Sequence, residues 1–125
     1  MSAVKSKEIL VVDDDPDILS LVALVLEGEG YRVSTASDGR AALEVVERGM
    51  PSLIVLDMRM AGMDGWQFAR EFRARYNGSA PILAFTATDD ARNRAAKIQA
   101  EGWIGKPFAV EDLIRTVDRH VADRR

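Results

Sequence analysis

Five side chains that could take part in chemistry lie at the ends of short apolar runs of this chain. They are Asp13, Asp14, Asp57, Thr86 and Lys106. Continuous apolar runs of this length are typical of strands buried in a parallel sheet. The carboxyl ends of parallel strands meet at one edge of the sheet, which is also where ligands bind in open α/β folds. We therefore expect these five side chains to lie close together.

Three of the five are carboxylates, and packing alone does not explain them. Like charges a few ångströms apart resist joint ionisation, so a cluster of them must be paired or bound to a metal. A helix N-cap accounts for a single aspartate, and Asp15 before Pro16 fits that role. The other three suit a hard cation such as Mg²⁺, which takes oxygen ligands and commonly combines carboxylates with phosphate oxygens.

A carboxylate in such a site can also attack phosphorus and form an aspartyl phosphate. Phosphoryl transfer depends mainly on positioning and on neutralising the oxygens of the transferred group. Lys106 offers a compact cation for this purpose, and Thr86 offers a hydroxyl donor. Alone, Lys106 would be interpreted as a surface lysine and Thr86 as a strand former. The neighbouring carboxylates favour the functional interpretation of both.

Apolar runs alternate with amphipathic stretches along the chain. The strands are expected at residues 8–13, 31–35, 53–57, 81–86 and 102–105. The helices are expected from Asp15 to about Gly28, at 38–48, from Asp64 with Gln67 as its capping-box partner, at 89–99, and through Leu113, Val117 and Val121. This alternation implies right-handed crossovers and a parallel sheet covered on both faces. We expect one α/β domain.

Composition narrows the classes of function. The 125 residues suit one domain with its own core. Without cysteine and with His120 as the single histidine, disulfides are excluded and a zinc site is close to excluded; we expect His120 to be solvated. A net charge of −3 with scattered basic residues argues against non-specific nucleic-acid binding, which needs a basic face. No apolar run approaches the ~20 residues that span a bilayer, and no secretory signal is visible, so we expect a cytoplasmic location.

Four motifs together resemble the signature segments of the receiver domains of two-component response regulators. They are Ile9–Pro16 (ILVVDDDP), Leu56-Asp57 with Gly62–Gly65 (GMDG), Phe85–Ala87 (FTA) and Lys106–Phe108 (KPF). They occur in the family's order and at nearly its spacing. The resemblance covers residues 7–122, which leaves 1–6 as a flexible N-terminal segment and 123–125 as a tail. It implies a flavodoxin-like, doubly wound (βα)5 domain with strand order 2-1-3-4-5.

The resemblance implies that Asp57 is the phosphoacceptor, supplied by a phosphohistidine on a sensor histidine kinase or phosphotransfer protein. Lys106 would pair with Asp57 at rest and with the phosphoryl group afterwards. The resulting domain would be a signalling switch that catalyses only its own phosphorylation and dephosphorylation. Arg59 and Thr88, which flank the site, are where we expect the lifetime of the phosphoryl group to be tuned.

The same resemblance implies how Mg²⁺ would be held. Asp14 would bind the ion directly and Asp13 mostly through water. Asp57 and the backbone carbonyl of Arg59 would complete the protein ligands. The family's chemistry thus agrees with the oxygen-rich cluster inferred from the residues alone.

The resemblance also implies a switch. Thr86 would move inward to the phosphoryl group, and Trp103 would follow into the vacated space. A downstream protein would bind the face made by the fourth helix, fifth strand and fifth helix, with no direct contact to nucleic acid or membrane. The chain departs from the family by having Ala61 in place of a proline and a shortened interval between Thr86 and Lys106.

Two other functions compete with a phosphoacceptor. A small Mg²⁺-dependent phosphatase of the haloacid-dehalogenase type would use Asp13 as nucleophile and Asp15 as acid and base. Pro16 follows where that motif would continue, and 125 residues leave little room for a cap over the substrate. A receiver that has lost its chemistry and acts only by binding is the third candidate, although the acidic pair, the threonine and the lysine are all present.

Overall fold

The structure is a computed structural model that describes residues 7–60, 64–77, 79–87, 93, 95–96 and 98–122. The elements in chain order are β1 (Glu8–Val12), α1 (Pro16–Gly28), β2 (Arg32–Ala36), α2 (Gly39–Arg48), β3 (Leu53–Asp57), α3 (Gly65–Tyr76), β4 (Ile82–Ala87), β5 (Gly102–Lys106) and α5 (Val110–Ala122). Every predicted strand is present, with β2 and β4 each beginning one residue later than expected.

Several expectations fall on parts of the chain outside this description. They concern the terminal segments 1–6 and 123–125, Ala61, Thr88 and most of the helix predicted at 89–99. Within that last range, the described positions 93, 95 and 96 are helical.

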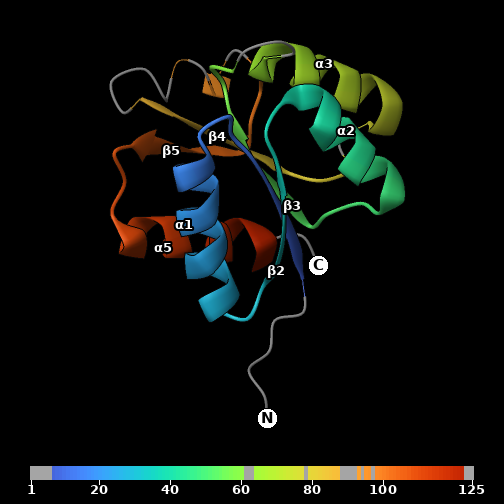
Figure 1. Cartoon of the computed structure of the whole chain (residues 1–125). Coiled ribbons are helices and arrows are strands. Elements are labelled where there is room, and N and C mark those ends of the chain that lie inside the picture. The colour runs from blue at the N-terminus through green and yellow to red at the C-terminus, as the bar shows by residue number, and fades with distance from the viewer. Residues whose placement is uncertain are drawn as a thin grey trace.

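The five strands form one parallel sheet in the order β2-β1-β3-β4-β5, which confirms the predicted fold class. Figure 1 shows α1 and α5 on one face of the sheet and α2 and α3 on the other. Among the helices that the structure describes, none combines the length and apolarity required to cross a bilayer.

The core has two halves because successive side chains of a strand point to opposite faces. In β1, Ile9 and Val11 pack with residues of α1 and α5. Leu10 and Val12 point the other way and pack with residues of α2 and α3. All four are fully buried, so the strand is apolar on both faces, as the unbroken apolar run predicted.

An aspartate caps the amino end of three of the helices. Asp15, Asp38 and Asp64 each accept a hydrogen bond from a backbone N–H two or three residues later, at 2.8–3.0 Å. Pro16 occupies the first turn of α1, where a missing N–H costs nothing. The Gln67 side chain accepts from the Asp64 N–H at 3.1 Å, which completes the predicted capping box of α3.

A polar network at the amino ends of β4 and β5 ties these strands to the helices. Arg73 of α3 donates to the carbonyl of Ile98, and to that of Gln99 at 3.1 Å. The Glu101 carboxylate accepts the backbone N–H of Ile82 at 2.7 Å. The network lies at the end of the sheet opposite to the carboxyl ends of the strands.

His120 belongs to the same network, so the expectation that it is solvated was wrong. Its ring is partly buried and lies 2.8 Å from the Thr116 carbonyl and 3.1 Å from the Glu101 carbonyl. Gly102 leaves the space for the ring, because a Cβ there would lie 2.7 Å from His120 Nε2. The contact joins α5 to the start of β5, and such a long-range contact is invisible in local sequence.

Candidate functional site

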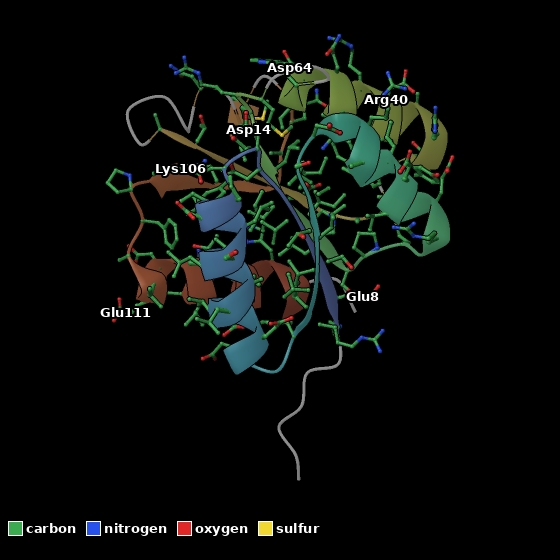
Figure 2. The ribbon with its side chains drawn as sticks, viewed as in Figure 1. Glu8, Asp14, Arg40, Asp64, Lys106 and Glu111 are labelled. Atoms are coloured by element: carbon green, nitrogen blue, oxygen red, sulfur yellow. The ribbon has the colours of Figure 1, made fainter. Side chains whose placement is uncertain are left out.

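The register of the sheet brings the predicted residues to one edge. Val12 pairs with Leu56, so Asp13 and Asp57 follow neighbouring positions of β1 and β3. Ala87 pairs with Lys106, which places the lysine at the carboxyl end of β5. Figure 2 shows Asp14 and Lys106 at this end of the sheet and Glu8 at the other.

The three carboxylates lie together there as predicted. One oxygen from each of Asp13, Asp14 and Asp57 lies within 4.8 Å of the others. Asp13 is fully buried and Asp57 is 4% exposed, whereas Asp14 is exposed. This combination gives a charged cluster with one side open to solvent.

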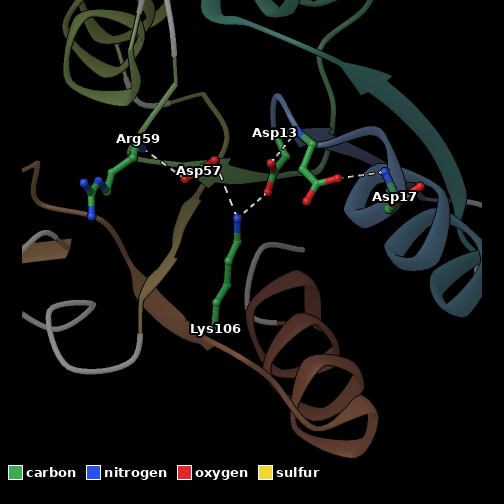
Figure 3. A network of polar contacts seen from close by, with 6 residues as sticks. Asp13, Asp17, Asp57, Arg59 and Lys106 are labelled. Atoms are coloured by element: carbon green, nitrogen blue, oxygen red, sulfur yellow. Dashed lines mark hydrogen bonds and ion pairs between the residues drawn. The ribbon is translucent and has the colours of Figure 1, made fainter.

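Backbone amides orient both buried carboxylates. Asp57 Oδ1 accepts the N–H of Arg59 at 3.0 Å. Asp13 Oδ1 accepts the N–H of Asp15 at 2.9 Å, and Asp15 Oδ1 in turn accepts the N–H of Asp17. Figure 3 shows the two bonds that start at Asp13 as a series that reaches from the site into the first turn of α1.

Lys106 lies between the two buried carboxylates. Its Nζ is 2.6 Å from Asp13 Oδ2 and 3.6 Å from Asp57 Oδ2 (Figure 3). The expected pairing with Asp57 is therefore present, but the shorter contact is with Asp13, the carboxylate that has no exposure to water and most needs a counter-charge. The same Nζ lies 4.6 Å from the ring centroid of Phe85, a neighbour that sequence reasoning missed.

Burial raises the pKa of the Asp57 carboxyl from 3.8 to about 6. The Arg59 N–H opposes the shift, the neighbouring Asp13 adds to it, and Lys106 again opposes it. Three carboxylates and one ammonium leave a formal charge of −2 when all are ionised. A divalent cation would balance that charge, and the donors present are all hard oxygens.

The two residues expected to switch differ in their surroundings. Thr86 is buried on β4, where it pairs with Gly105 of β5. Trp103 is 43% exposed on β5. It lines a groove of about 300 Å³ between β5 and α5 together with Phe108 and Thr116. In the register of the sheet, Trp103 pairs with Ala84, two positions before Thr86 on β4.

A parallel sheet in this order, with an aspartate-lysine cluster at its carboxyl edge, defines a receiver domain. The family model of the response regulator receiver domain matches residues 9–118, and the chain belongs to that family. It is a receiver of two-component phosphorelay signalling. The expectation from the sequence motifs is confirmed.

Individual relatives agree with the family match. Probable transcriptional regulatory protein TcrX of Mycobacterium tuberculosis is 34% identical over 85% of this chain and 46% of its own length. Response regulator MprA of Mycobacterium leprae is 38% identical over 87% of this chain and 48% of its own length. The chain thus spans about half the length of these two curated relatives.

Among solved structures, chemotaxis response regulator CheY4 of Vibrio cholerae superposes with a TM-score of 0.84 at 33% identity, over 92% of this chain and 98% of that one. The comparisons give no support to a haloacid-dehalogenase-type phosphatase. The site agrees, because the Asp15 carboxylate that would act as acid and base caps α1 instead.

Proposed function

We propose that this domain accepts a phosphoryl group on Asp57 from a phosphohistidine of a sensor histidine kinase or phosphotransfer protein. The observation that carries the proposal is the position of Asp57, a nearly buried carboxylate beside Asp13 and Lys106 at the edge of the sheet. A buried carboxylate with a raised pKa and a cationic neighbour is typical of functional sites.

In the proposed transfer, a carboxylate oxygen of Asp57 forms a bond to phosphorus while the bond between phosphorus and the imidazole nitrogen of the donor breaks. The bonding electron pair stays with that nitrogen. With a pKa of about 6, Asp57 is mainly ionised at neutral pH and able to attack. Lys106 moves to a phosphoryl oxygen, and Thr86 turns its hydroxyl toward another.

The residues present fit Mg²⁺. Asp13, Asp14, Asp57 and the backbone carbonyl of Arg59 would hold it, and the three carboxylates already lie within reach of one ion. When bound, the ion neutralises charge on the phosphoryl oxygens. The proposed role of the protein is to keep these ligands in place before the donor arrives.

We place the output on β5 and α5, with the fourth helix as the remaining part of that face. Trp103 and Val110 are 43% and 41% exposed there, and the groove beside Trp103 offers apolar surface to a downstream protein. Movement of Thr86 toward Asp57 would free space for Trp103 and change that surface. We propose a cytoplasmic location and signalling through protein contacts without nucleic acid.

Acetyl phosphate and Mg²⁺ test the chemistry without a kinase. We expect one hydroxylamine-sensitive phosphoryl group that maps to Asp57 by mass spectrometry and is lost in Asp57→Asn. Asp17→Asn, which removes an exposed carboxylate nearby, is the matched control and should be phosphorylated normally. Labelling at Asp13, or turnover of phosphomonoesters that depends on Asp13, would instead support a hydrolase.

Beryllofluoride with Mg²⁺ tests the switch, because it mimics the phosphoryl group. In a Trp66→Phe background, all tryptophan fluorescence comes from Trp103. We expect the emission to shift as the indole changes its exposure. An unchanged spectrum in protein shown to bind the mimic would exclude Trp103 as the switching aromatic.

A further inference from the structure

Helix α3 makes an unusually close approach to the chain that follows Asp57. Gly65, the first residue of the helix, is buried against it. A Cβ placed on Gly65 would lie 2.7 Å from Met58 Cα, 2.8 Å from the Asp57 carbonyl oxygen and 2.9 Å from Met58 Sδ. Real Cβ atoms essentially never come within 3.0 Å of such neighbours.

The glycine is required here for space and not for conformation. Gly65 has helical backbone, with φ outside the left-handed range that favours glycine. Two of the three close atoms belong to backbone, which cannot turn aside as the end of a side chain can. Any larger residue must therefore displace either α3 or the segment from Asp57 to Arg59.

Contacts at its first turn and along its inner face hold helix α3 in position. The capping box of Asp64 and Gln67 fixes its first turn. Phe68 and Phe72 are fully buried and anchor its inner face in the core. The Met58 side chain is buried too, but the segment lies beyond the end of β3 and reaches the exposed Arg59, so we expect this segment to move before α3 does.

The size of that movement decides its effect. Ordinary van der Waals contact begins at 3.4 Å, so relieving the 2.7 Å approach to Met58 Cα takes about 0.3 Å to reach the 3.0 Å limit and about 0.7 Å to reach ordinary contact. Functional groups must stay within about 0.5 Å of their productive geometry. Met58 lies between Asp57 and Arg59. The carboxylate of Asp57 and the backbone carbonyl of Arg59 both belong to the proposed metal site.

We infer that Gly65 is a positioning residue for the phosphoacceptor site. By allowing α3 to contact the Asp57–Met58 backbone, it sets where the Asp57 carboxylate and the Arg59 carbonyl stand. The inference rests on the proposed function at Asp57, since it names a residue that supports the same site without touching the reacting atoms.

Gly65→Ala tests the inference, with Gly49→Ala as the matched control because a Cβ at Gly49 meets nothing within 4 Å. In metal-free protein, we expect Gly65→Ala to shift the NMR signal of the Arg59 amide, which donates to Asp57. Its Mg²⁺ dissociation constant should rise, and its rate of phosphorylation by acetyl phosphate should fall, each about tenfold or more. Gly49→Ala should match the wild type in all three.

Loss of packing must be separated from loss of position. Met58→Ala should lower stability toward urea while leaving Mg²⁺ affinity near that of the wild type. If Gly65→Ala is less stable than the wild type, binding is measured at a temperature at which both it and Met58→Ala are folded, and the weakened Mg²⁺ binding should appear in Gly65→Ala alone. Equal Mg²⁺ affinity of Gly65→Ala and Met58→Ala would overturn the inference.

The outcomes also separate this inference from the proposed function. If the wild type and Gly49→Ala are phosphorylated on Asp57 and Gly65→Ala equals them, only the role of Gly65 is refuted. If neither the wild type nor the control is phosphorylated, the proposed function itself fails.

Discussion

Asp57→Asn removes a carboxylate that burial makes costly to ionise, so we expect the variant to be more stable than the wild type in metal-free solution at neutral pH. The folded protein holds the pKa of Asp57 at about 6, against 3.8 for the ordinary group. The difference is about two pKa units, and each unit corresponds to about 1.4 kcal/mol. The expected gain in unfolding free energy is about 3 kcal/mol.

The pH dependence has a definite sign. Between about pH 3.8 and pH 6, folded protein keeps a proton on Asp57 that the unfolded chain has lost. The stability contributed by that proton is fully present below about pH 3.8 and is lost as the pH rises through 6. The wild type and Asp57→Asn should therefore differ by less than about 1 kcal/mol near pH 4 and by about 3 kcal/mol near pH 7.5.

Urea unfolding in EDTA at these two pH values measures the difference. Asp17→Asn controls for loss of an exposed carboxylate and should stay within about 0.5 kcal/mol of the wild type. Adding Mg²⁺ at about a hundred times its dissociation constant should stabilise the wild type by about 2.7 kcal/mol and largely close the gap. Equal or lower stability of Asp57→Asn at pH 7.5 without metal would refute the reasoning.

Three further predictions concern the contacts around the site and the sheet. Lys106→Met leaves the buried Asp13 carboxylate without its 2.6 Å partner and should cost about 3 kcal/mol in EDTA by urea unfolding; an unchanged urea midpoint would contradict the pairing. Asp64→Ala should cost about 1 kcal/mol through loss of the α3 cap, whereas Asp64→Asn should cost much less by the same assay. Gly102→Ala should displace the His120 ring, shift its NMR signals and cost about 1–2 kcal/mol; wild-type ring signals would show that the ring tolerates the added methyl.

Sequence reasoning succeeded where local chemistry decides structure. The apolar runs ending in Asp13 and Asp57 identified strands buried on both faces, because no solvent-facing strand carries such a continuous run. Asp64 and Gln67 identified the start of α3, because the cap is formed within four residues. The strand order followed from resemblance to the receiver family, and the parallel register then brought the expected side chains together.

Contacts between distant segments could not be predicted in the same way. Nothing near His120 in the sequence indicates that its ring meets the Glu101 carbonyl. The preference of Lys106 for Asp13 over Asp57 depends on differences of about an ångström that spacing does not encode. Gly65 is visible in the sequence as the last residue of the GMDG motif. The reason for a glycine there, a close approach to Met58, exists only in the fold.

The hydrogen-bond series that begins at Lys106 extends the site into α1. Lys106 binds one oxygen of Asp13, the other oxygen accepts the Asp15 amide, and the Asp15 carboxylate accepts the Asp17 amide. Hydrogen bonds in such a series polarise one another, so a change of partner at one end alters those further along. If Lys106 leaves Asp13 for a phosphoryl oxygen, as in the proposed transfer, we expect the Asp15 amide to become a natural spectroscopic probe of the charge on Asp57, with the Asp17 amide carrying the signal to the surface of the domain.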